Sequence, residues 1–370
     1  MAGKIANNID VGIITIREDE FSAVLRKLPN GDQLTGARRY TVGSVEANNG
    51  TQVTVAVMRC QEEGTGEAQS ATRDMLEDIA PACVMVVGIA GGYPADEFSL
   101  GDVVVSTRIH DFTVAAAREG RRLQYQVTGG RINKEIGSLV AHFRAMEDEL
   151  GDWYELRTIV TRPTVSVPVP FSRLYGSKNW KEKVRTSLTS HFSNPRTQPI
   201  VYAGPIASSD TLVKDTECAQ AFLDAGSRKV VAIEMEMAGC YRACHDKNVP
   251  CLSVRGISDI VGLERESVWT DYACTTAASF AHALIRTGTL PRRSAPIGDA
   301  SSAIHVPQMA AMPSQAPASE QPTAHDIAGD SVTTASAVKA PTDVFTPRNP
   351  NVNESMYAAV TVGWTATGVE

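Results

Sequence analysis

The sequence predicts an α/β fold: a single domain with a mixed central β-sheet flanked by helices, followed by a disordered C-terminal tail. Three observations carry this prediction. Short apolar, β-branched runs alternate with segments of helical periodicity from residue 11 to residue 287. Asn49-Gly50 separates two strand-like runs, which is the strongest short signal of a hairpin. From residue 291 the chain is rich in Ala, Pro and Ser, a composition that cannot bury a core.

The predicted strands share short length, apolar character and flanking turn residues. They are Val11–Ile16, Tyr40–Val45, Gln52–Met58, Cys83–Val87, Asp102–Val105, Ile200–Ala203, Val230–Ile233 and Leu252–Ile257. The predicted helices have apolar residues at helical spacing. They are Glu18–Leu28, Gly66–Ile79, Glu135–Leu150, Asp215–Ala225, Glu236–Lys247 and Tyr272–Thr287. This order gives one domain over residues 1–290 and a low-complexity tail over 291–370, in which 355–366 is either a short docking segment or part of the disordered end.

The composition is typical of a globular protein and excludes several classes. Hydrophobic residues make up 43% and charged residues 21% of the 370, and the net charge of −7 argues against a nucleic-acid partner. No apolar run approaches the roughly 20 residues of a membrane span, and the N-terminus lacks the apolar core of a secretory signal. The seven cysteines are expected to be reduced thiols, which favours a cytoplasmic location. Cys240, Cys244 and His245 lack a second pair of ligands, so no metal is expected.

Carboxyl groups follow three of the predicted strands. They lie in residues 17–20 (REDE), 234–236 (EME) and 258–259 (SD), and the Gly-rich segment 88–92 follows a further strand. Taken alone, each segment is most simply interpreted as solvated charge in a loop. However, α/β sheets present ligand sites at strand ends. Cleavage of a purine N-glycosidic bond uses such a set: an acid for the leaving base, negative charge beside the sugar cation, and a base for the nucleophile.

Residues 1–290 resemble the nucleoside phosphorylase superfamily, most of all its methylthioadenosine/S-adenosylhomocysteine nucleosidase branch. The matching stretches follow the family order and span most of the domain. They are VGIITIREDEFSAVL at 11–25, VMVVGIAGG at 84–92, LGDVVVS at 100–106, GPIASSDTLV at 204–213 and VAIEMEMAGCYRACHDKNVPCLSVRGISDIVG at 231–262. The resemblance implies a hydrolase that cleaves the N-glycosidic bond of a purine nucleoside or nucleotide, with adenine as the expected base, and releases the base and the ribose moiety.

The resemblance also implies roles for single residues. Glu20 is expected to activate the attacking water. Asp259, steadied by Ser258, is expected to protonate the purine at N7. Glu236 is expected to hold the ribose hydroxyls, with Met235 packed against the sugar.

Further residues are expected to shape the substrate pocket. Ala90 and Gly91 are expected to belong to a turn that lets the backbone approach sugar and base. Arg255 is expected to orient a nearby carboxylate, or else only to hold a loop. Leu212 stands where the branch usually has an aromatic that stacks on adenine, so recognition of the base falls to the main chain around Leu212 and Val213.

Water is the predicted nucleophile. A phosphorylase holds phosphate with Arg, Ser or backbone groups, but Val86 and Ile89 stand where the resembling phosphorylases carry an Arg and a Ser. One alternative is a phosphorylase whose anion site is rebuilt from Arg59, Gly64 and Gly66. Another is a non-catalytic nucleotide-sensing module, although a pure binder needs no acid and base together.

The basic and aromatic segment 168–185 has two interpretations. It is either a solvated helix face or a lid whose Arg173 or Lys178 contacts a 5′-phosphate chain, which would make the substrate a nucleotide. The resemblance further implies a homodimer or larger homo-oligomer, with no metal, no organic cofactor and no membrane association.

Overall fold

The computed structural model describes residues 9–28, 31–117, 119, 123–154, 161–226 and 229–293. These residues belong to one compact unit, Met1–Ser301. Apart from positions 291–293, the predicted tail and its segment 355–366 lie outside the described residues.

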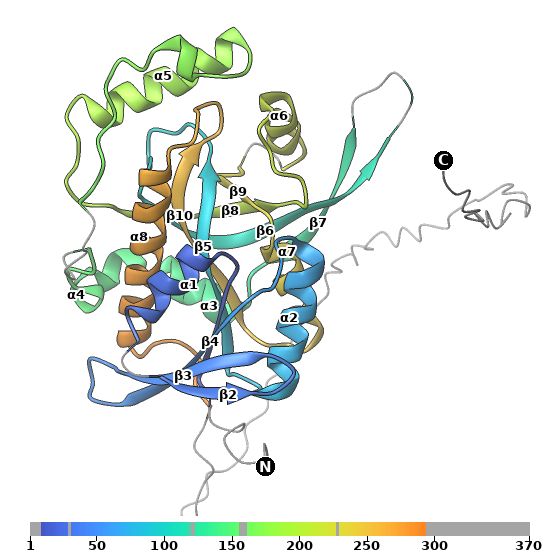
Figure 1. Cartoon of the computed structure of the whole chain (residues 1–370), viewed down its shortest axis with the longest axis vertical. Coiled ribbons are helices and arrows are strands. Elements are labelled where there is room, and N and C mark those ends of the chain that lie inside the picture. The colour runs from blue at the N-terminus through green and yellow to red at the C-terminus, as the bar shows by residue number, and fades with distance from the viewer. Residues whose placement is uncertain are drawn as a thin grey trace, which may run out of the picture. The chain divides into compact units, whose positions relative to one another are not determined.

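The described strands form one ten-stranded mixed sheet, which confirms the predicted α/β architecture (Figure 1). The strands are β1 (Val11–Thr15), β2 (Asp32–Thr35), β3 (Arg39–Glu46), β4 (Gln52–Arg59), β5 (Cys83–Gly92), β6 (Val103–Ala116), β7 (Gln124–Arg131), β8 (Val201–Ser208), β9 (Ala232–Glu234) and β10 (Cys251–Ile260). Their order is β10-β6-β8-β9-β5-β1-β4-β3-β2, with β7 beside β6.

Part of this sheet closes on itself. Strand β10 runs parallel to β5 and antiparallel to β6, while β6, β8 and β9 lead back to β5. The strands β5, β10, β6, β8 and β9 therefore form a small closed ring. This ring fixes the ends of β5, β9 and β10 next to one another, which is where the predicted site residues lie.

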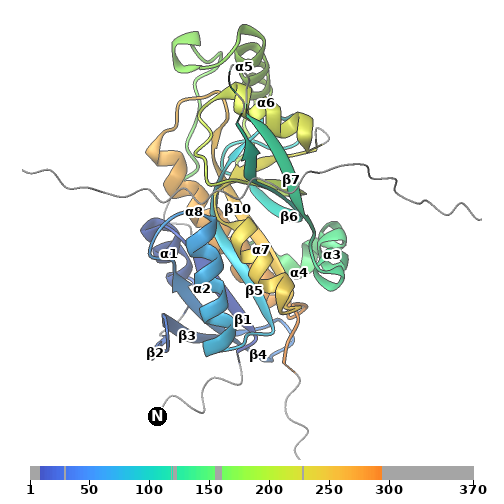
Figure 2. The same cartoon turned by 90° about the vertical axis from the view of Figure 1, so that its right-hand side faces the viewer.

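Helices cover both faces of the sheet (Figure 2). They are α1 (Glu18–Leu25), α2 (Thr65–Asp78), α3 (Lys134–Ala141), α4 (Glu147–Leu150), α5 (Lys178–Phe192), α6 (Thr216–Ala225), α7 (Met237–Asp246) and α8 (Ser267–Arg286), with 3₁₀ turns at Phe143–Met146 and Phe171–Arg173. Val84 and Val86 of β5 pack in the core that contains α2 and α7, whereas Met85 and Val87 pack in the core that contains α1 and α8. No described helix has both the length and the apolar character that a membrane span requires.

The predicted hairpin at Asn49-Gly50 is confirmed, because β3 and β4 pair antiparallel around it and Gly50 has a φ of +80°. The predicted single helix Glu135–Leu150 is wrong. Helix α3 ends at Ala141, and a 3₁₀ turn follows in which Phe143 and Met146 are buried. Phe143 packs edge-on against Phe280 of α8, at 5.6 Å between ring centroids, so packing against α8 overrides helical continuity here.

The Gly-rich segment 88–92, predicted as a turn, is instead the second half of β5. It remains a strand because both of its edges are paired: Gly88 with Arg255 of β10, and Gly91 with Ile233 of β9. For the same reason β10 continues to Ile260, so Asp259 lies within a strand and not after one. The correction places Ala90 and Gly91 in a strand that has a partner on each side, and not in a Gly-rich turn.

Candidate active site

Most of the predicted site residues line one cavity of about 190 Å³ at the ends of β1, β5 and β9. Its described lining residues are Ile16, Arg17, Glu20, Glu63, Ile89, Ala90, Gly91, Thr211, Leu212, Val213, Ile233, Glu234, Met235, Glu236, Val261 and Arg265. Arg255 and Ser258 do not line the cavity and lie buried behind it. Asp259 lies at its edge, since a Cβ placed on Gly91 would be 3.2 Å from Asp259 Oδ2.

Glu20 is held by backbone groups at the start of α1. Its Oε2 accepts the N–H groups of Ile16 at 2.9 Å and Arg17 at 3.0 Å, and its Oε1 accepts the N–H of Ile89 at 2.9 Å. The contact with Arg17 is the backward reach of a capping-box glutamate, which explains the position of Glu20 in the first turn. Burial raises the pKa of Glu20, while Arg255 and these N–H groups oppose the rise. A fixed carboxyl with a raised pKa is suited to accept a proton from water.

Arg255 lies among the carboxylates of the 234–236 segment. Its Nη2 contacts Glu234 Oε2 directly and lies 3.6 Å from Glu236 Oε2. Glu234 also accepts the N–H groups of Glu236 at 3.1 Å and Met237 at 2.9 Å, so it caps the start of α7. Burial of Arg255 lowers its pKa, but the surrounding carboxylates outweigh burial and leave it above the usual value. This guanidinium is therefore a permanent positive charge beneath the cavity.

Glu236 is buried beside another acid. Burial first, and then the charge of Glu234, raise the pKa of Glu236 to about 8, while Arg255 and the N–H of Gly64 act in the opposite direction. At neutral pH, Glu236 therefore carries a proton for most of the time. A protonated carboxyl both donates and accepts hydrogen bonds, which suits a pair of sugar hydroxyls.

The approach of Arg255 to Glu20 depends on Gly88. A Cβ on Gly88 would overlap the Glu20 carboxylate and would lie 2.7 Å from Arg255 Nη1. Only a residue without a side chain allows both groups to pack over β5 at this point. The sequence predicts a turn at Gly88, but in the structure Gly88 lies in a strand and leaves room for the two side chains.

The two carboxylate oxygens of Asp259 have different surroundings. Its Oδ1 accepts hydrogen bonds from Ser258 Oγ at 2.8 Å and from Arg265 Nε at 2.9 Å and Nη2 at 2.7 Å. Its Oδ2 lies close to Gly91, which lines the cavity. Sequence reasoning missed Arg265, because it lies in the loop between β10 and α8, where no periodicity or strand end marks it.

A family model described as the phosphorylase superfamily matches residues 10–287. The chain belongs to the phosphorylase superfamily. This membership confirms the resemblance drawn from residues 1–290.

Individual relatives agree with this membership. The chain is 26% identical over 254 residues to a 5′-methylthioadenosine/S-adenosylhomocysteine nucleosidase of Desulfotalea psychrophila, covering 68% of this chain and 84% of that protein. It is 27% identical to the ATP nucleosidase Cap17 of Escherichia coli over 64% of this chain, but spans only 42% of Cap17. The solved nucleosidase of Colwellia psychrerythraea in complex with adenine has a TM-score of 0.52 at 19% identity, covering 76% of this chain and 96% of that one, and shares the fold.

Three arginines near the cavity or in the predicted lid segment are paired with acidic side chains. Arg17 donates to Asp19, with Nη2 at 2.8 Å from Oδ2, and Arg59 pairs with Glu18. Arg173 of the predicted lid segment pairs with Glu266. Neither Arg59, Arg173 nor Lys178 is among the described residues that line the cavity.

The loop that follows β8 brings Leu212 and Val213 to the cavity. Asp210 anchors this loop by accepting the N–H of Thr65 at 2.7 Å, and Ser209 N–H donates to the carbonyl of Glu234 at 3.1 Å. The Leu212 side chain is 53% exposed although it lines the cavity. A ligand or a neighbouring chain can therefore cover it.

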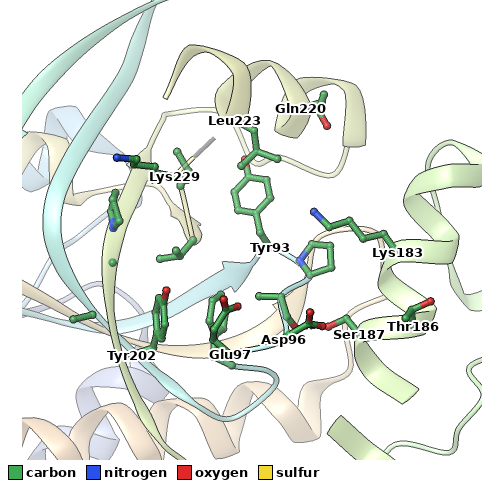
Figure 3. Close-up of a pocket in the computed structure, with 18 residues that line it drawn as sticks. Tyr93, Asp96, Glu97, Lys183, Thr186, Ser187, Tyr202, Gln220, Leu223 and Lys229 are labelled. Atoms are coloured by element: carbon green, nitrogen blue, oxygen red, sulfur yellow. The ribbon is translucent and has the colours of Figure 1, made fainter. Parts of the chain in front are cut away.

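Figure 3 shows a second cavity, of about 980 Å³, between α5, α6 and β8. Lys183 extends into it from α5, and Tyr93 and Tyr202 form part of its wall. None of the predicted site residues is among the described residues that line it. The cavity that holds the carboxylates is the smaller one, so chemistry and not volume identifies the candidate active site.

Proposed function

We propose that this chain hydrolyses the N-glycosidic bond of a purine nucleoside or nucleotide, with release of the free base and the ribose moiety. The gathering of Glu20, Glu236 and Asp259 around one cavity carries the proposal. These groups come from α1, from the segment after β9 and from β10, and only the folded sheet brings them together. The names of the relatives, which are nucleosidases, support the same reaction.

The geometry suggests a complete reaction path. Asp259 Oδ2 faces the cavity and donates a proton to N7 of the purine, so the electron pair of the C1′–N9 bond can leave with the base. Glu236 binds the ribose hydroxyls, and the ionised carboxyls nearby stabilise the positive charge that develops on the sugar. Water attacks C1′, and Glu20 accepts its proton. Ser258 positions Asp259 through its bond to Oδ1.

Water is proposed as the nucleophile instead of phosphate. The basic groups near Glu20, Arg17 and Arg59, are already paired with carboxylates. A phosphate ion in this cavity would lie close to the carboxyl groups of Glu20 and Glu234, and like charges this close disfavour binding.

Three finer features belong to the same proposal. Adenine is the proposed base, read by the main chain around Leu212 and Val213. A homodimer or larger homo-oligomer is proposed, and the exposed Leu212 at the cavity supports it. The cytoplasm is the proposed location, since all seven cysteines are free thiols.

The test is base release from methylthioadenosine, adenosine, AMP and ATP, with and without phosphate, by wild type and Asp259→Asn. We expect release that needs no phosphate and that the substitution abolishes. Asp246→Asn, an exposed acid on α7, is the matched control and should retain activity. Release only with phosphate would make the chain a phosphorylase, and binding without release would make it a sensing module.

A further inference from the structure

Arg265 makes a contact that bears on the chemistry of Asp259. Two of its nitrogens, Nε and Nη2, donate to Asp259 Oδ1, and Nη2 also lies 3.4 Å from Ser258 Oγ. The Arg265 side chain is 42% exposed and lines the cavity. One side chain thus reaches both the proposed acid and the space where substrate would bind.

This contact opposes the proposed first step of the reaction. Arg265 occupies Oδ1 of the residue that is proposed to donate a proton to the purine. A productive substrate must therefore compete with Asp259 for the guanidinium.

The charges around the cavity indicate which substrate would do so. Among the described lining residues, Arg17 and Arg265 are the basic ones, and both have substantially exposed side chains. The carboxyls of Glu20 and Glu234 also line the cavity and disfavour an anion close to them. A negatively charged substituent would consequently stay at the rim, within reach of the arginines.

We propose that Arg265 is a positioning and specificity-determining residue that leaves Asp259 to bind a phosphate group on the 5′ side of the substrate, so that the chain acts on purine nucleotides in preference to nucleosides. The inference rests on the proposed N-glycosidic hydrolysis and names its substrate class. The phosphate competes with Asp259 for one guanidinium, and the Arg265 side chain is exposed enough to change partners.

The proton balance of this step is simple. When Arg265 moves to the phosphate, the Asp259 carboxylate takes one proton from solvent. It gives that proton to N7 as the C1′–N9 bond breaks, and it becomes a carboxylate again. Arg265 can then return to Oδ1 as base and ribose phosphate leave, which resets the site.

Two other ionisable groups lie near this exchange. Burial raises the pKa of Tyr175, which precedes α5, and nearby Asp259 adds to the rise while Arg265 opposes it. Glu63 also lines the cavity and is exposed. Its negative charge disfavours an anion close to it, so the phosphate is expected beside Arg265, and Glu63→Gln should strengthen the preference for nucleotides.

The experiment compares kcat/KM for adenosine and AMP in wild type, Arg265→Gln, Arg265→Lys and the control Arg173→Gln. Arg173 pairs with Glu266, the neighbour of Arg265, but does not line the cavity. For wild type we expect a preference for AMP of about tenfold or more, the scale of one charge-assisted contact. Arg265→Gln should remove this preference, because kcat/KM should fall for AMP and rise for adenosine. Arg265→Lys should retain part of it, and Arg173→Gln all of it.

The pH profile separates this role from a purely structural one. With adenosine, the pH profile of kcat/KM should differ between Arg265→Gln and wild type, because the substitution removes the positive charge that contacts the proposed acid. Equal losses for both substrates, an unmoved pH profile, or loss of preference in Arg173→Gln would each overturn the inference while leaving hydrolysis intact. Absence of base release by wild type from either substrate would instead overturn the proposed function itself.

Discussion

Replacing Glu236 by Gln should change how the stability of the protein depends on pH. Burial and the adjacent Glu234 raise the pKa of Glu236 to about 8, whereas in the unfolded chain it titrates near its usual value of 4.5. Between these values the folded protein holds a proton that the unfolded chain has lost. The free energy of unfolding therefore falls as pH rises through this window, and it levels off above the folded pKa. Glutamine has no proton to lose, so the variant escapes this decline.

The size of the effect follows from the two pKa values. One pH unit of differential protonation corresponds to about 1.4 kcal/mol, and the folded group is half-titrated at about pH 8. Between about pH 6 and about pH 8, the Gln variant should gain roughly 2 kcal/mol on wild type. For a domain of this size that corresponds to a relative rise in Tm of about 4 °C.

The assay is urea or thermal unfolding of wild type, Glu236→Gln and the exposed-site control Glu97→Gln at both pH values. The control should follow wild type, because Glu97 is exposed and remains hydrated. A difference between Glu236→Gln and wild type that is the same at both pH values would refute the reasoning, whatever its sign. Base release by Glu236→Gln should fall at either pH, since the proposed ribose ligand is altered.

Three further changes test the packing and chemistry of the same cavity. Gly88→Ala should destabilise the fold by about 1–3 kcal/mol and lower kcat/KM, since its Cβ would push Glu20 and Arg255 apart. Urea unfolding measures the loss of stability. The control is Gly66→Ala, whose Cβ would meet nothing within 4 Å, so its stability should stay the same or rise. Leu212→Phe should tighten adenine binding about fivefold through ring stacking, measured as product inhibition, and unchanged inhibition would place the base elsewhere. Glu20→Gln should abolish base release while substrate binding by calorimetry persists, and retained turnover would exclude Glu20 as the base.

The central elements of the fold could be predicted because their signals are local. The strand Val11–Thr15 is a buried β-branched run, and Asn49-Gly50 supplies the positive φ that a tight hairpin needs. Strand β7 was missed because its residues alternate only between exposed and half-buried, so no apolar face marks it. The end of β5 was misassigned because five residues rich in Gly look like a turn until partners on both edges are known.

In the candidate site, too, some residues could be predicted from the sequence and others could not. Glu20, Glu236 and Asp259 could be predicted because each belongs to a recognisable stretch that follows or ends a strand. Arg265 could not, because its contact with Asp259 depends on the path of the loop between β10 and α8. The sequence predicts only that Arg255 orients a nearby carboxylate. That its partners are Glu234 and Glu236 follows from the register of β10 against β5.

The closed ring of strands also determines when the protein can first act. Strand β10 is the last of the described strands, and it pairs with both β5 and β6, which precede it in the sequence. Until β10 enters, Asp259 is missing from the cavity and the buried acids at its floor lack the charge of Arg255. A chain in which β10 is not yet in place therefore lacks part of the proposed catalytic machinery. Closure of the ring of strands and completion of the candidate site are the same structural event.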